Sequence, residues 1–145
     1  MAVIQTVGFV PTPDTPGQPW NYFVPIVNLA DQYIDFYQPQ AYNNGYDSFA
    51  GGSVGYLQDV YLNWRNLAAQ GTPIAGYNGI AGKKLLIGLE ASTSAGGSSF
   101  YATPDVINQF KSWLISEGHD LEGFMIWDSH WDAINGNAIS TACAA

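Results

Sequence analysis

The chain has 145 residues, of which 47% are hydrophobic, and its four basic residues leave a formal net charge of −8. This length suits one domain with a hydrophobic core (residues 1–145) but excludes a complete eight-stranded (β/α) barrel, which needs about 250 residues. Because nucleic acids and anionic membranes are bound by cations, the charge argues against both as partners.

The first half of the chain alternates apolar runs with amphipathic segments. Val3–Val10 predicts a buried strand, and Tyr22–Gln32 predicts a helix in which Pro25 is tolerated in the first turn. Tyr33–Gln40 predicts the second strand. Ser53–Gln70 then predicts a helix with Ser53 as its N-cap and a glycine, Gly71, just beyond its end. The helix has one apolar stripe, made of Val54, Leu57, Tyr61, Trp64 and Ala68.

The second half continues the alternation. Lys84–Leu89 predicts a third strand. Thr103 predicts the N-cap of a third helix, with Pro104 at its first position and Gly118 at its end. The stripe of this helix is Ile107, Phe110 and Leu114. Gly123–Trp127 predicts the fourth strand, and residues 135–145 are expected to form a short tail.

This order of elements predicts a parallel α/β sheet whose strands are buried on both faces. The alternative is an open doubly wound sheet, but no Gly-x-Gly-x-x-Gly or phosphate loop follows any strand. In either fold, ligand sites lie in the loops after the strands. Those loops are 11–21, 43–52, 91–102 and 128–135.

Several kinds of site and segment are not expected. Cys143 is the only cysteine, which excludes an internal disulfide and a cysteine-based zinc site, and no cofactor or metal is predicted. Met1–Thr6 lacks the basic and apolar parts of a signal peptide. No apolar run reaches the length of about 18 residues that spans a membrane.

The second and fourth strands end in side chains that suit a ligand. Gln40 and Tyr42 are two residues apart, so they share a face and can both hydrogen-bond a substrate. Alternatively, Tyr42 only fills the interior and Gln40 satisfies backbone groups. Trp127 offers a flat floor for a sugar ring, or it is simply a core tryptophan.

Three runs together resemble glycoside hydrolase family 18, the chitinase family. Tyr37–Asn43 resembles its sixth strand, Lys84–Leu89 with the following Ala-Ser its seventh, and Gly123–Asp132 its eighth. Pro13–Pro16 matches the segment after the fifth strand more loosely. The resemblance implies a partial TIM (β/α)8 barrel, approximately strands five to eight with their helices.

The same resemblance implies a function. Family members cleave chitin by a substrate-assisted retaining mechanism, in which the acetamide of the sugar attacks the anomeric carbon. Tyr42 matches the catalytic tyrosine that supports the acetamide. Gln40, Asn43 and Trp127 match positions that bind chitin or chito-oligosaccharide. The resemblance also implies an extracellular parent enzyme.

Two departures from the family pattern stand out. The family's general acid belongs to an Asp-x-x-Asp-x-Asp-x-Glu run on the fourth strand, and these 145 residues contain no such run. We therefore expect the chain to be inactive by itself, since general acid catalysis needs a positioned proton donor. The second departure is Glu90, where the family commonly has proline.

The remaining titratable residues leave alternatives open. Glu90 and Asp128 end neighbouring strands, which lie about 4.8 Å apart, so they could form a conventional retaining pair at about 5 to 5.5 Å. Otherwise Glu90 is a solvated loop residue and Asp128 bonds local backbone. Asp132, like Asp14, is expected in a turn. His119 is expected at the surface. His130 either contacts a ligand or is an ordinary loop residue.

A carbohydrate-binding or oligomerising module without catalysis is the alternative function. A half barrel leaves its first and last strands with open edges, which favour pairing. Two copies related by a two-fold axis, or the missing N-terminal half-barrel added in trans, would cover those edges.

Overall fold

The computed structural model describes residues 2–5, 23–42, 52–67, 76–96 and 98–144. For residues 2–5 and 23 only the backbone is described. Several sequence predictions therefore lie outside the described residues. They are Asn43, Asp14, Pro13–Pro16, Ala68, Gly71 and the second half of Val3–Val10.

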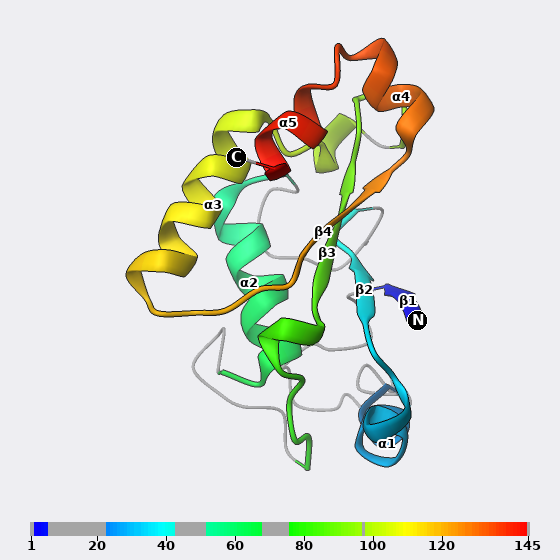
Figure 1. The fold of residues 1–145 in the computed structure, drawn as a ribbon, viewed down its shortest axis with the longest axis vertical. Helices are drawn as coiled ribbons and strands as arrows, with labels where there is room; N and C mark the ends of the chain where they lie inside the picture. The colour runs from blue at the N-terminus through cyan, green and yellow to red at the C-terminus, as the bar shows by residue number, and fades with distance from the viewer. Residues whose placement is uncertain (1, 6–22, 43–51, 68–75, 97, 145) are drawn as a thin grey trace.

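In the described part of the chain, four parallel strands form one sheet in the order β1-β2-β3-β4 (Figure 1). The strands are β1 (Ala2–Gln5), β2 (Tyr37–Gln40), β3 (Leu86–Glu90) and β4 (Gly123–Trp127). The predicted parallel α/β order is confirmed. Two strands begin later than expected because short 3-10 helices, η2 (Asp31–Tyr33) and η3 (Gly82–Lys84), take up their first residues.

Helices cross from each strand to the next. They are α1 (Phe23–Ala30), α2 (Val54–Arg65) and α3 (Pro104–Ser116), with a 3-10 turn η4 (Ser98–Phe100) before α3. Both predicted N-caps are confirmed: Ser53 accepts a hydrogen bond from the Tyr56 N–H, and Thr103 accepts one from the Val106 N–H. These bonds satisfy amides that a helix start otherwise leaves unpaired.

The end of α2 was predicted wrongly. The helix stops at Arg65, because Asn66 adopts a left-handed conformation with φ 56° and ψ 40°. Asparagine tolerates this conformation, and the Asn66 side chain gains a hydrogen bond of 2.7 Å from Nδ2 to the Tyr77 carbonyl oxygen. The local turn therefore outweighs the helical pattern that continues in the sequence.

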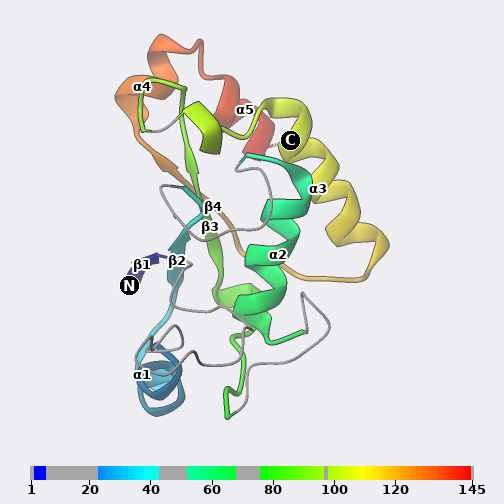
Figure 2. The same cartoon turned by 180° about the vertical axis from the view of Figure 1, so that it is seen from behind.

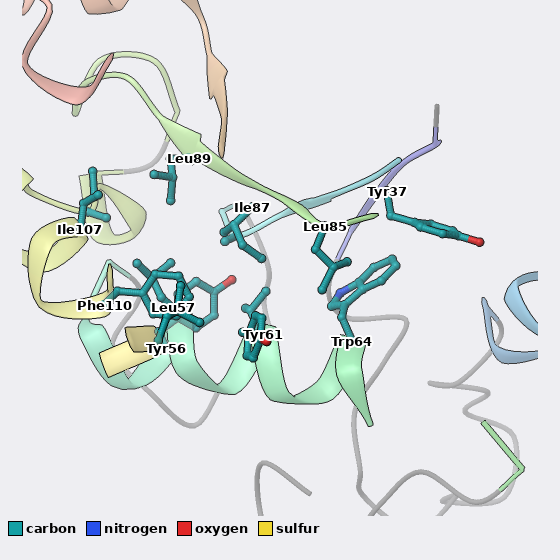
Figure 3. Packing of buried hydrophobic residues seen from close by; sticks show 14 of the residues in the cluster. Tyr37, Tyr56, Leu57, Tyr61, Trp64, Leu85, Ile87, Leu89, Ile107 and Phe110 are labelled. Atoms are coloured by element: carbon teal, nitrogen blue, oxygen red, sulfur yellow. The ribbon is translucent and has the colours of Figure 1, made fainter. Parts of the chain in front are cut away.

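Helices α2 and α3 cover one face of the sheet (Figure 2). Figure 3 shows the side chains of Ile87 and Leu89 of β3 pointing toward the helices, together with that of Leu85, the residue just before the strand. The middle of the predicted α2 stripe (Leu57, Tyr61, Trp64) and the whole α3 stripe (Ile107, Phe110, Leu114) are buried with them. Burying each aliphatic side chain stabilises the fold by about 1.5–3 kcal/mol, so this layer fixes the orientation of the sheet.

Strand β4 and the C-terminal segment differ from the predictions. All five β4 residues are partly exposed, although burial on both faces was expected, because β4 lies at an edge of the described sheet. The expected loop and tail instead form two short helices, α4 (Ser129–Ile134) beyond the carboxyl end of β4 and α5 (Ala138–Ala144), which turns back to lie next to α3 (Figure 1). No described helix is long and apolar enough to cross a membrane.

Asp132 joins these two helices and is not the exposed turn residue that we expected. Its side chain in α4 is 4% exposed. Its two carboxylate oxygens accept hydrogen bonds from the Ile139 and Ser140 amides at 3.0 and 3.3 Å. A carboxylate at the start of a helix pairs with free amides and with the helix dipole, so Asp132 caps the start of α5.

Replacing Asp132 should destabilise the protein measurably. Asp132→Ala leaves two amides at the start of α5 without their partners, and we expect the free energy of unfolding to fall by about 1–3 kcal/mol in urea titrations. Asp35→Ala, at an exposed position, is the control and should change it by less than about 0.5 kcal/mol. Equal effects of the two substitutions would contradict the assigned role.

Candidate functional site

Alternation along the strands divides the sheet into two chemically different faces. Ile87 and Leu89 of β3 face the helices, so Gly88 and Glu90 point to the other side. In β4, Phe124 and Ile126 pack on the helical core. We call the side away from α2 and α3 the second face. Its central residues are Gln40, Tyr42, Gly88, Glu90, Met125 and Trp127.

The strand register aligns three of these side chains at the carboxyl end of the sheet. Gln40 pairs with Gly88, and Glu90 pairs with Trp127. Tyr42 comes two residues after Gln40, and Glu90 comes two residues after Gly88. The three side chains therefore form a row, Tyr42–Glu90–Trp127, at the ends of β2, β3 and β4. Two backbone hydrogen bonds of 2.9 Å hold these strand ends together. The Ala41 N–H donates to the Gly88 carbonyl oxygen, and the Ala91 N–H donates to the Trp127 carbonyl oxygen.

Gly88 leaves room for Met125 in the middle of the second face. A Cβ atom at position 88 would lie 2.8 Å from the Met125 Cε and 2.9 Å from the Pro39 carbonyl oxygen. Both distances are too short for a side chain, so only glycine lets Met125 lie across β3. Neither residue was predicted to matter for the site, although a glycine inside a strand is a signal of such close packing.

Tyr42 is buried and stays protonated at neutral pH. The side chain is 4% exposed. Burial raises the pKa of Tyr42 most, and the charge of Glu90 raises it further. Alternation along the strand places Gln40 and Tyr42 on one face, as predicted. A neutral phenol can both donate and accept a hydrogen bond.

Glu90 is not the solvated loop residue that we expected. It is the last residue of β3 and its side chain is fully buried. The strand continues through Glu90 because β4 pairs with it up to Trp127. The apolar run in the sequence ends one residue earlier, and this is why the sequence analysis placed Glu90 in the loop.

Trp127 lies at the exposed end of the row. Its side chain is 51% exposed, and of the described tryptophans it is the one most open to solvent. The alternative of a core tryptophan is therefore wrong. The Trp127–Asp128 peptide bond is cis. An exposed indole beside polar groups is a surface on which a sugar ring can stack.

Asp128 bonds local backbone, as one of the two interpretations predicted. Its Oδ1 accepts hydrogen bonds from the His130 and Trp131 amides at 2.9 and 3.2 Å. Asp128 is therefore the N-cap of α4. This capping role speaks against Asp128 as half of a conventional carboxylate pair with Glu90. His130 is exposed and its ring contacts the neighbouring Trp131.

Two other polar residues differ from expectation or were missed. His119 is only partly exposed, because its ring lies 5.2 and 5.1 Å from the rings of Tyr61 and Trp113. Asn135 donates from Nδ2 to the Ala91 carbonyl oxygen and to Tyr101 Oη, both at 3.0 Å. Asn135 thus ties the end of α4 to the segment after β3, a contact that no local pattern indicates.

The sequence is similar to those of chitinases. A chitinase of Enterococcus faecalis is 26% identical over 141 residues, covering 89% of this chain and 39% of that protein. An acidic endochitinase of Arabidopsis thaliana is 29% identical over 112 residues, covering 77% of this chain and 33% of its own length. The chain thus spans between a third and two fifths of the length of these two relatives. No protein-family model matches the chain.

The fold is similar to that of solved family 18 chitinases. The structure from Chromobacterium violaceum matches with a TM-score of 0.71 at 22% identity, over 99% of this chain and 43% of that one. The structure from Pseudoalteromonas aurantia matches with a TM-score of 0.65 at 19% identity, over 97% and 44%. The resemblance noted in the sequence is confirmed: this chain is chitinase-like in sequence and has a fold found in family 18 chitinases.

The charge of Glu90 should be measurable at Tyr42. Glu90→Gln removes a negative charge that disfavours phenolate, so the pKa of Tyr42 should fall, yet stay above 10.0 because burial persists. A pH titration of the tyrosine Cζ resonances by NMR measures this. Glu122→Gln changes an exposed carboxylate and should leave the value unchanged. An unaltered Tyr42 titration in Glu90→Gln would contradict the arrangement of the row.

Proposed function

We propose that this chain forms strands five to eight of a family 18 barrel, as one domain, and binds chitin or chito-oligosaccharide on its second face. The observation that carries the proposal is the row of Tyr42, Glu90 and Trp127 at the carboxyl ends of neighbouring strands. In parallel barrels that end of the strands builds the active site. The chitinase relatives support the same ligand class.

Each residue has a role that its surroundings allow. Trp127 offers its exposed indole to the apolar face of a sugar ring. Tyr42 and Gln40 supply a hydroxyl and an amide for the N-acetyl group. Asn43, outside the described residues, is proposed as a further ligand-binding residue. An extracellular location of the parent enzyme belongs to the same proposal.

Hydrolysis, in this proposal, needs an acid that these 145 residues do not supply. The run Asp-x-x-Asp-x-Asp-x-Glu is absent from the sequence. Two carboxylates at this end of the sheet are poorly placed to donate a proton to a ligand, since Glu90 is buried beside Tyr42 and Asp128 caps the start of α4. The substrate-assisted mechanism then requires the proton donor from another segment or chain.

The 145-residue chain should bind a chitin oligomer without cleaving it. Titration with the N-acetylglucosamine tetramer, followed by tryptophan fluorescence, should saturate, and Trp127→Ala should weaken the affinity about tenfold through loss of a central aromatic contact. Tyr33→Ala removes an even more exposed aromatic ring, that of Tyr33 in η2 at 81% exposure, and should not change the affinity.

Product analysis after long incubation tests the second half of this prediction. No shorter oligomers should appear above the rate without protein. Robust cleavage by the purified chain would contradict the proposed lack of an acid. Equal loss of affinity in both aromatic variants would contradict the binding site at Trp127.

A non-catalytic oligomeric module is the second candidate function, favoured by one observation. Strand β4 is last in the described sheet and all five of its residues are partly exposed. Such an edge pairs readily with another chain. Sedimentation at micromolar concentration should then give a dimer, which two-fold symmetry would close. A stable, compact monomer would speak against this candidate.

A further inference from the structure

Glu90 is a buried carboxylate that the proposed binding roles do not use. It is fully buried although a charge inside a protein costs free energy unless neighbouring groups compensate it. It does not lie in the helical core but on the second face, at the end where Tyr42 and Trp127 lie. This position also departs from the proline that the family resemblance leads one to expect.

The register fixes which side chain Glu90 acts on. Tyr42 and Glu90 follow the Gln40–Gly88 pair by two residues each, on the same side of adjacent strands. Neither strand can slide, because a shift of one residue would turn Ile87 and Leu89 out of the helical core. The carboxylate and the phenol are therefore held next to each other by the whole sheet.

We propose that Glu90 is a positioning residue for the sugar-binding site and acts through Tyr42. The carboxylate attracts the hydroxyl hydrogen of Tyr42 and so sets the direction in which the phenol donates and accepts. Burial removes water that would otherwise reorient the hydroxyl. In this proposal Glu90 acts through Tyr42 and makes no contact with the ligand itself. This inference rests on the proposed function, because it assigns a helper to the same site.

The electrostatics agree with this geometry. The charge of Glu90 opposes loss of the Tyr42 proton and raises its pKa, as burial does. A tyrosine that stays neutral keeps its hydrogen available for a hydrogen bond. The aligned pair thus favours one protonation state and one orientation of the hydroxyl that is proposed to hold the acetamide.

A double-mutant cycle on ligand affinity separates positioning from mere packing. Glu90→Gln should weaken binding of the N-acetylglucosamine tetramer about tenfold in the Tyr42 protein, and less than about twofold when Tyr42→Phe is already present. Glu90→Asp, which keeps the charge, should restore part of the affinity. An equal loss in both backgrounds, or no loss in either, would overturn the proposal.

A ligand-free measurement keeps this test independent of the proposed function. If the unmodified chain binds no tetramer at millimolar concentration, the proposed function fails, and the Tyr42 Cζ chemical shift at neutral pH decides the present inference. Glu90→Gln should displace that shift while Glu122→Gln leaves it in place. Identical spectra for the two variants would overturn the positioning role, and circular dichroism checks that each variant is folded.

Discussion

The packing of β3 against α2 and α3 is the constraint from which the rest of the structure follows. Leu85, Ile87 and Leu89 are almost completely buried on the helix side, among Leu57 and Tyr61 of α2. Because side chains alternate along a strand, this apolar layer also determines which residues point the other way. A slip of one residue would expose the whole layer, so the register is strongly specified.

The polar row of the second face is a consequence of that register. The register of the strands places Glu90 between Tyr42 and Trp127. This alignment does not depend on direct contacts among the three side chains. Gly88 adds a steric condition, since it admits Met125 across the centre of the face. The hydrophobic layer behind the candidate site therefore fixes the order and facing of its residues, which is what a preorganised binding site needs.

The sequence predicted the parts of the fold that depend on local physics. Helix starts at Ser53 and Thr103 follow from capping chemistry, and the buried stripes follow from helical spacing. The end of α2 was missed because Asn66 is stabilised by Tyr77, which lies outside the helical pattern, eleven residues further along the chain. Helices α4 and α5 were missed because they are too short for a periodic pattern and depend on the capping carboxylates.

Glu90 was the most informative failure among the site residues. The residue type and the end of the apolar run at Leu89 favour a solvated carboxylate, but β3 continues through Glu90 in its pairing with β4 and the residue is buried. Local preference and tertiary structure disagree at this position, and such disagreements concentrate at functional sites, where stability is exchanged for a useful arrangement. An isolated buried carboxylate in the helical core would be only a cost. Next to a buried phenol and an exposed indole, the same charge can organise how a ligand is held.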